Sequence, residues 1–145
     1  MVKNKNSKVF LLLFTGSLTA FGPIMTDVYL PAFPQMQQYF GTSVSLVQLS
    51  LTFGMLGLAL GQLFLGPVSD KYGRVRPLAF SLGVFSLATV ACIFSPTIYY
   101  FLFFRLVQGI FGAGGVVIAR SIIVDLYSGR ELSVFFSLLA GIQGI

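Results

Sequence analysis

The 145-residue chain has too few charged residues to cover the surface of a soluble domain. Only 9% of its residues are charged and 56% are hydrophobic, whereas a typical soluble domain is about 25% charged. The net charge of +5 does not indicate nucleic-acid binding, because the nine basic residues occur in small groups between apolar runs and do not line one face. With no histidine and a single cysteine, Cys92, neither a disulfide framework nor a zinc or haem site is indicated. The composition predicts a protein whose solvent is the lipid bilayer.

Four apolar segments are long enough to cross a membrane, which takes about 20 mainly apolar residues in a helix. In chain order they cover residues 9–30, 44–65, 77–94 and 97–118. A fifth apolar run begins near Leu132 and stops at Ile145, too soon to complete a crossing. All are expected to be helices, because an open sheet would leave unpaired backbone groups in lipid. The predicted fold class is therefore an all-α polytopic membrane protein.

Residues that stop or start helices lie between these segments. Pro31 and Pro34 close the first, and the sequence SPT at residues 95–97 indicates a tight reversal between the third and the fourth. Ser45 and Gln48 have the spacing of a capping box and are expected to begin the second helix.

Alternate connections are basic, which predicts the orientation. The connection over residues 31–43 and the turn around Pro96 carry no charge. The basic residues lie before the first segment, between the second and the third, and after the fourth: Lys3, Lys5, Lys8, Lys71, Arg74, Arg76, Arg120 and Arg130. Since basic loops stay in the cytoplasm, residues 1–8 are expected to form a cytoplasmic tail. An alternative is that the first segment is a cleaved signal peptide, but the apolar run is long and no A-x-A site closes it.

Two ionisable residues lie within the predicted spans, Asp27 in the first and Arg105 in the fourth. Such a group is costly in lipid unless it faces a polar interior or a partner, so both are candidate site residues. At 1.5 Å per residue, Asp27 is about 27 Å and Arg105 about 20 to 23 Å from the cytoplasmic ends of their helices. We therefore expect similar depths. A structural alternative is that Asp27 reaches the headgroups and caps the proline-rich turn.

Small residues indicate where helices or a solute approach closely. Gln108 and Gly109 follow Arg105 at i+3 and i+4, and residues 112–115 have almost no side chain. In the second segment a second stripe is expected to serve helix packing: Ser50, Gly54, Gly57 and Gly61. The sequence GIFGAGG does not fit a dinucleotide-binding loop, because no strand precedes it and the spacing differs.

The connection between the second and third segments, GPVSDKYGRVRPL at residues 66–78, is the most particular motif. Gly66 and Gly73 are expected to supply the unusual dihedral angles of a short turn. Asp70 can cap the next helix. It can also pair with one of three basic residues, Lys71, Arg74 and Arg76. The alternative is that these basic residues serve only as anchors on the cytoplasmic side.

With these motifs the chain resembles the major facilitator superfamily, and within it the drug:proton antiporters of the Bcr/CflA (bicyclomycin and chloramphenicol resistance) branch. Residues 66–76 are similar to the superfamily's signature loop, and RLVQGIFGAGG from Arg105 is similar to the antiporter motif of the fourth helix. TDVYLPAFP at residues 26–34 resembles the end of the branch's first helix. ARSIIVDLYSGRE from Ala119, which contains Arg120 and Asp125, resembles its stretch after the fourth helix. One departure is Val124, where relatives commonly carry an arginine before the aspartate.

The resemblance implies a fold of twelve helices in two six-helix halves, of which residues 9–145 would be part of the N-terminal bundle. In such folds the first helix of each three-helix repeat lines the central cavity. Those are the spans with Asp27 and Arg105. The implied proton and substrate cavity includes Asp27, Arg105, Gln108 and Gly109.

The implied function is proton-coupled efflux of small amphipathic drugs across a bacterial cytoplasmic membrane. It needs no cofactor beyond the proton gradient, and it is expected to require the C-terminal half as a partner. No enzyme chemistry is indicated, since no nucleophile lies beside a recognisable base. Three alternatives remain: proton-coupled uptake, a small four-helix pump acting as a dimer, and a non-transporting protein whose polar residues only join helices.

Overall fold

The computed structural model describes residues 5–20, 23–24 and 29–143. Within that part the regular structure is helical. The elements are α1 (Lys5–Thr19), the short 3-10 helix η1 (Leu30–Ala32), α3 (Phe33–Phe40), α4 (Val44–Tyr72), α5 (Val75–Ile93), α6 (Ile98–Leu126) and α7 (Gly129–Gln143). The predicted all-α class is confirmed for the described residues.

Three of the described helices, α4, α5 and α6, are long and apolar enough to cross a membrane. The described part of the first segment is shorter, since α1 ends at Thr19. Two further helical hydrogen bonds follow, from the Ala20 amide to the Gly16 carbonyl and from the Ile24 amide to the Ala20 carbonyl. The predicted continuation to about residue 30 falls partly on residues 21–22 and 25–28, which lie outside the described residues.

Two helices continue beyond the apolar segments that predicted them. The sequence placed their ends near residues 65 and 118, but α4 continues to Tyr72 and α6 to Leu126. The length of an apolar segment reflects only the thickness of the hydrocarbon layer that the helix crosses. The helical hydrogen bonds can continue into the polar region beyond that layer. Arg120 and Asp125, predicted to follow the fourth span, therefore lie in the last turns of α6.

Three local expectations at helix ends were wrong. Gly66 lies inside α4, and Gly73 alone takes up the turn, with φ at +83°. Such an angle favours glycine because it has no Cβ. The N-cap of α4 is Ser43, whose hydroxyl accepts from the Leu46 amide, so the capping-box spacing at Ser45 was misread by two residues. Asp70 lies in the last turns of α4, and the N-cap of α5 makes no side-chain cap bond.

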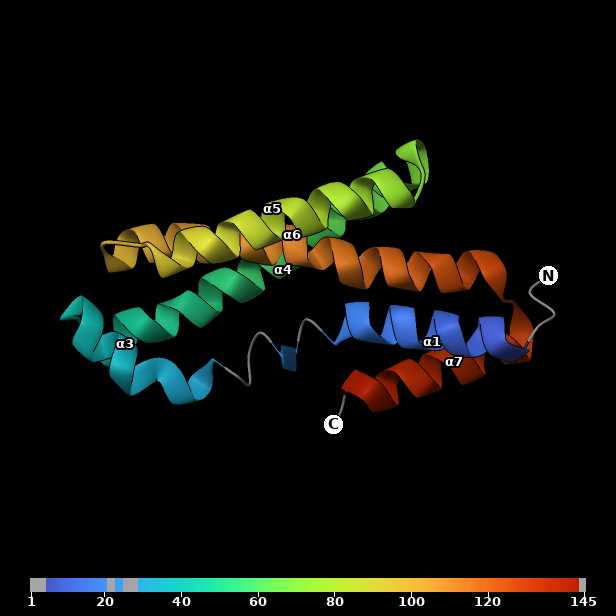
Figure 1. Ribbon diagram of the computed structural model, residues 1–145, viewed down its shortest axis with the longest axis horizontal. Coiled ribbons are helices and arrows are strands. Elements are labelled where there is room, and N and C mark those ends of the chain that lie inside the picture. Colours follow the sequence, from blue (N-terminus) through green and yellow to red (C-terminus); the bar gives the residue numbers. More distant parts are fainter. Residues whose placement is uncertain (1–4, 21–22, 25–28, 144–145) are drawn as a thin grey trace.

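Helix α6 lies at the centre of the packing, with α4 and α5 against it (Figure 1). The contact with α4 is backbone to backbone. A Cβ atom on Gly57 would lie 2.3 Å from the Leu106 carbonyl oxygen, and one on Gly61 would lie 2.1 Å from that of Ile110. The glycine stripe of the second segment therefore serves helix packing, as predicted.

Apart from Arg105, the described basic residues collect toward one end of the molecule. The N-terminal end of α1, the turn between α4 and α5 and the junction of α6 with α7 lie toward the right of Figure 1. Helix α3 and the turn between α5 and α6 lie toward the left. At the basic end α1 and α7 are joined by an ion pair of 2.9 Å between Lys8 and Glu131. An apolar cluster that packs against Leu11 and Leu12 of α1 includes Tyr127, Phe135 and Leu139.

Candidate functional site

Arg105 is buried on α6, about two turns after the start of that helix, with 6% of its surface exposed. Its Nη1 donates a hydrogen bond of 2.7 Å to Oε1 of Gln108, one turn further along the helix. The Gln108 side chain, equally buried, donates from Nε2 to the Thr89 hydroxyl of α5 at 2.7 Å. The guanidinium group is therefore held by a neutral acceptor, which is itself held by the neighbouring helix. We call these residues, together with Tyr29 described next, the Arg105 cluster: Tyr29, Thr89, Arg105 and Gln108.

Tyr29 covers the other side of the guanidinium group. The Arg105 Cζ atom lies 4.2 Å from the centre of the Tyr29 ring, a distance at which a cation is attracted by the ring's π electrons. The Tyr29 hydroxyl hydrogen-bonds to Ser50 of α4, and the ring stacks on Phe101. Sequence reasoning missed this residue, which lies within the apolar segment of residues 9–30.

Two glycines near Arg105 have different surroundings. A Cβ on Gly54 would lie 3.7 Å from Arg105 Nη2, so α4 can pass directly beside the guanidinium group. Gly109, predicted as a cavity residue, lies in the contact between α4 and α6: its Cβ would lie 2.2 Å from the Gly54 carbonyl oxygen. Its position therefore allows the approach of α4.

No carboxylate among the described residues forms an ion pair with Arg105. Its Nε atom is also buried without a hydrogen-bond partner in that part of the chain. Asp27, the predicted acidic residue of the cavity, lies outside the described residues, two positions before Tyr29. A buried cation with an unused donor can bind a carboxylate or a hydrogen-bond acceptor of a solute.

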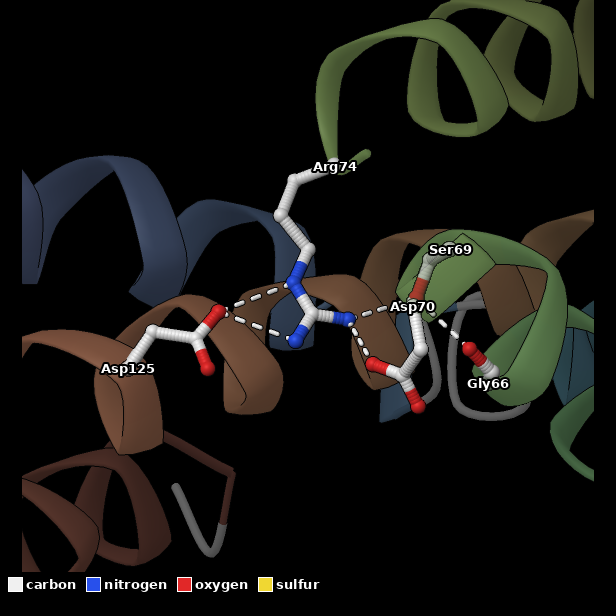
Figure 2. Close-up of polar contacts among 5 residues, drawn as sticks. All are labelled: Gly66, Ser69, Asp70, Arg74 and Asp125. Atoms are coloured by element: carbon white, nitrogen blue, oxygen red, sulfur yellow. Dashed lines mark hydrogen bonds and ion pairs between the residues drawn. The ribbon is translucent and has the colours of Figure 1, made fainter. Parts of the chain in front are cut away.

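A second polar cluster joins the basic ends of three helices, and Arg74 is its centre (Figure 2). From the turn before α5, its Nε and Nη2 atoms each lie 2.9 Å from Oδ2 of Asp125 on α6. Its Nη1 atom donates to the carboxylate of Asp70 and, at 2.9 Å, to the Ser69 hydroxyl, both on α4. We call Ser69, Asp70, Arg74 and Asp125 the Arg74 cluster.

The Ser69 hydroxyl has a defined direction within this cluster. It is almost fully buried and donates to the Gly66 carbonyl oxygen at 2.8 Å, so it accepts from Arg74. Burial lowers the pKa of the Arg74 guanidinium, but the hydrogen bonds to Asp70 and Asp125 outweigh it and raise this pKa above its ordinary value. Arg74 therefore stays charged and bridges two carboxylates.

Of the three basic residues predicted as partners of Asp70, the structure selects Arg74. Arg76 and Lys71 are exposed and form no ion pair among the described residues. Asp125 joins the cluster although Val124 precedes it. Next to the cluster is an open cavity of about 540 Å³. Arg120, exposed near the end of α6, lines it together with Arg74, Asp70, Asp125, Gln62, Val117, Ser121 and Val124.

A family model described as the Major Facilitator Superfamily matches residues 10–145 of the chain. The chain belongs to the major facilitator superfamily. This family and the apolar helices α4, α5 and α6 identify a multi-pass membrane protein. The resemblance drawn from the motifs is confirmed.

The relatives include proteins named for drug resistance. The chain is 36% identical over 133 residues to a bicyclomycin resistance protein homolog of Haemophilus influenzae, covering 90% of this chain and 33% of the relative. It is 34% identical over 119 residues to a chloramphenicol resistance protein of Pseudomonas aeruginosa, covering 81% and 29%. It is 43% identical over 143 residues to an uncharacterized MFS-type transporter, YdgK, of Bacillus subtilis, covering 99% and 35%.

The chain spans about a third of the length of these relatives. No solved structure gives a significant match.

Proposed function

We propose that this chain forms part of a proton-coupled exporter of small amphipathic drugs. The observation that carries the proposal is the buried Arg105, whose described partners are a neutral amide and an aromatic ring. A protein that only needed to join helices would not require a full charge at this depth, because such a charge costs several kcal/mol in lipid. The names of the bicyclomycin and chloramphenicol resistance relatives support drugs as the substrate class.

The surroundings of Arg105 offer a substrate both polar and aromatic contacts. The Nε donor of Arg105 has no hydrogen-bond partner among the described residues, and Tyr29 presents an aromatic ring beside it. Amphipathic antibiotics combine hydrogen-bond acceptors with apolar surface, and pockets for such molecules join a few polar groups to an apolar wall. Chloramphenicol and bicyclomycin are therefore the probes we choose.

Proton coupling requires a group that holds a proton in one state and releases it in another. Asp27 is the acidic residue of the first predicted span, and we assign it this role. A conformational change that alters its access to water or its distance from Arg105 would change its protonation. The proton gradient then serves as the energy source without a cofactor.

The orientation and the remaining partner follow from the same proposal. The basic end of the molecule lies in the cytoplasm of a bacterium, with the cytoplasmic membrane around the helices. The chain acts together with the rest of a longer transporter, because alternating access needs two bundles that move about one site. The Arg74 cluster joins the cytoplasmic ends of α4, α5 and α6, so that they move as one body.

The test replaces Arg105 in the complete transporter, produced in a drug-sensitive bacterium. Arg105→Gln keeps hydrogen-bonding capacity but removes the charge, and we expect loss of chloramphenicol and bicyclomycin resistance at unchanged membrane abundance. Arg76→Gln, which removes an exposed charge of the cytoplasmic loop, is the matched control and should retain resistance. Equal resistance in the two variants would show that the buried charge has no part in transport. Drug accumulation driven inward by the wild-type protein would favour uptake.

A further inference from the structure

The Thr89 hydroxyl lies between its own helix and the side chain of Gln108. Its Oγ1 atom is 2.8 Å from the Phe85 carbonyl oxygen and 2.7 Å from Gln108 Nε2. A carbonyl oxygen can only accept, so the single hydroxyl proton is donated to Phe85. Thr89 must therefore act as an acceptor toward Gln108.

This assignment fixes which end of the Gln108 amide faces Arg105. A glutamine side chain has an acceptor oxygen on one side and an NH₂ donor on the other. Because Nε2 faces Thr89, the oxygen faces Arg105 Nη1, 2.7 Å away. The reversed amide would place its NH₂ group against the guanidinium group, where two donors would face each other. Both side chains are buried, so bulk water cannot supply the lost acceptor.

We infer that Thr89 is a positioning residue for Arg105: its hydroxyl holds the Gln108 carbonyl toward the guanidinium group and thereby fixes the direction of the unused Nε donor. The inference rests on the proposed function, in which Arg105 contacts the drug. It gives α5 a part in the site although the one charged residue of that helix, Arg76, lies in its first turn, far along the helix from Thr89.

The first test is a double-mutant cycle on thermal unfolding of the complete transporter in detergent micelles, which needs no transport activity. Thr89→Val removes the hydroxyl and keeps the shape, and Gln108→Leu removes the amide. Thr89→Val should lower the unfolding temperature in the wild-type background and change it little in the Gln108→Leu background, because the shared hydrogen bond is already lost. Thr89→Ser, which keeps a hydroxyl, should unfold close to the wild-type temperature.

The matched control is Thr15→Val. The Thr15 hydroxyl also bonds to carbonyl oxygens of its own helix, those of Leu11 and Leu12, and it lies on α1. The change in unfolding temperature caused by Thr15→Val should add fully to the change caused by Gln108→Leu. If Thr89→Val adds to Gln108→Leu as completely as this control does, Thr89 does not act through Gln108 and the inference is wrong.

The second test measures chloramphenicol transport in vesicles, because a purely structural role would leave substrate affinity unchanged. Thr89→Val should raise the apparent KM roughly fivefold, the size expected for one neutral hydrogen bond, while Thr89→Ser stays near wild type. An unchanged KM in Thr89→Val would overturn the positioning role. If the wild-type transporter moves no chloramphenicol, the proposed function fails, and the unfolding cycle still decides the role of Thr89.

Discussion

The contact between α4 and α6 allows a quantitative prediction, because it leaves no room for a methyl group at Gly57. A Cβ there would lie 2.3 Å from the Leu106 carbonyl oxygen and 2.9 Å from the Ile110 amide nitrogen. A carbon atom normally approaches such an oxygen to about 3.3 Å, so Gly57→Ala must separate the two backbones by about 1 Å. Neither contact atom belongs to a side chain that could turn away. We therefore expect the upper part of the range for overpacking, about 3 kcal/mol.

The matched control is Gly83→Ala on α5, where an added Cβ meets no atom of the described residues within 4 Å. This change should stabilise the helix by up to about 1 kcal/mol, because alanine is the better helix former. Thermal unfolding in detergent, followed by the loss of helical circular dichroism, should place Gly57→Ala about 6 to 12 °C below the wild type. Gly83→Ala should unfold at or slightly above the wild-type temperature. If Gly57→Ala unfolds no lower than Gly83→Ala, the two helices do not pack backbone to backbone.

Three further predictions concern the polar clusters and the orientation. Arg74→Gln breaks the contacts to two carboxylates and should cost about 1 to 2 kcal/mol in chemical unfolding, whereas the exposed Arg76→Gln should change stability by less than about 0.5 kcal/mol; equal costs would remove Arg74 from the contact between helices. In a Cys92→Ala background, Ser43→Cys should react with a membrane-impermeant thiol reagent added outside the cell. Tyr72→Cys, at an exposed position, should react only after the membrane is opened. The opposite pattern of labelling would reverse the orientation. Tyr29→Phe keeps the ring over Arg105 and loses the hydrogen bond to Ser50. It should therefore weaken chloramphenicol binding less than Tyr29→Leu, which loses the ring as well. An equal loss of binding affinity in the two variants would mean that the ring contact contributes nothing.

Features that depend on local pattern could be predicted from the sequence. The apolar segments identified α4, α5 and α6, and the spacing of Gly54, Gly57 and Gly61 predicted the close contact now seen with α6. The motif around Arg105 identified both the family and a buried charge. In each case the chemistry of lipid restricts which sequences can occupy the position.

Features that depend on how helices are rotated against one another could not be predicted. Tyr29, Ser69 and Thr89 are ordinary residues of apolar helices or turns in the sequence, and their roles come from partners on other helices. The ends of α4 and α6 were also missed, because polar residues beyond the hydrocarbon layer can continue a helix as readily as end it. Asp27 lies outside the described residues, so its role stays a prediction.

The central claim is that an intramembrane carboxylate couples drug export to proton movement, and proton flux in vesicles tests it most directly. The complete transporter is reconstituted with a pH-sensitive dye inside, and chloramphenicol is added on one side. The wild-type protein should move protons opposite to the drug, Asp27→Glu should keep part of this flux, and Asp27→Asn should lose it at equal protein content. Full drug-dependent proton movement in Asp27→Asn would contradict the account and return Asp27 to the role of a residue at the end of a helix.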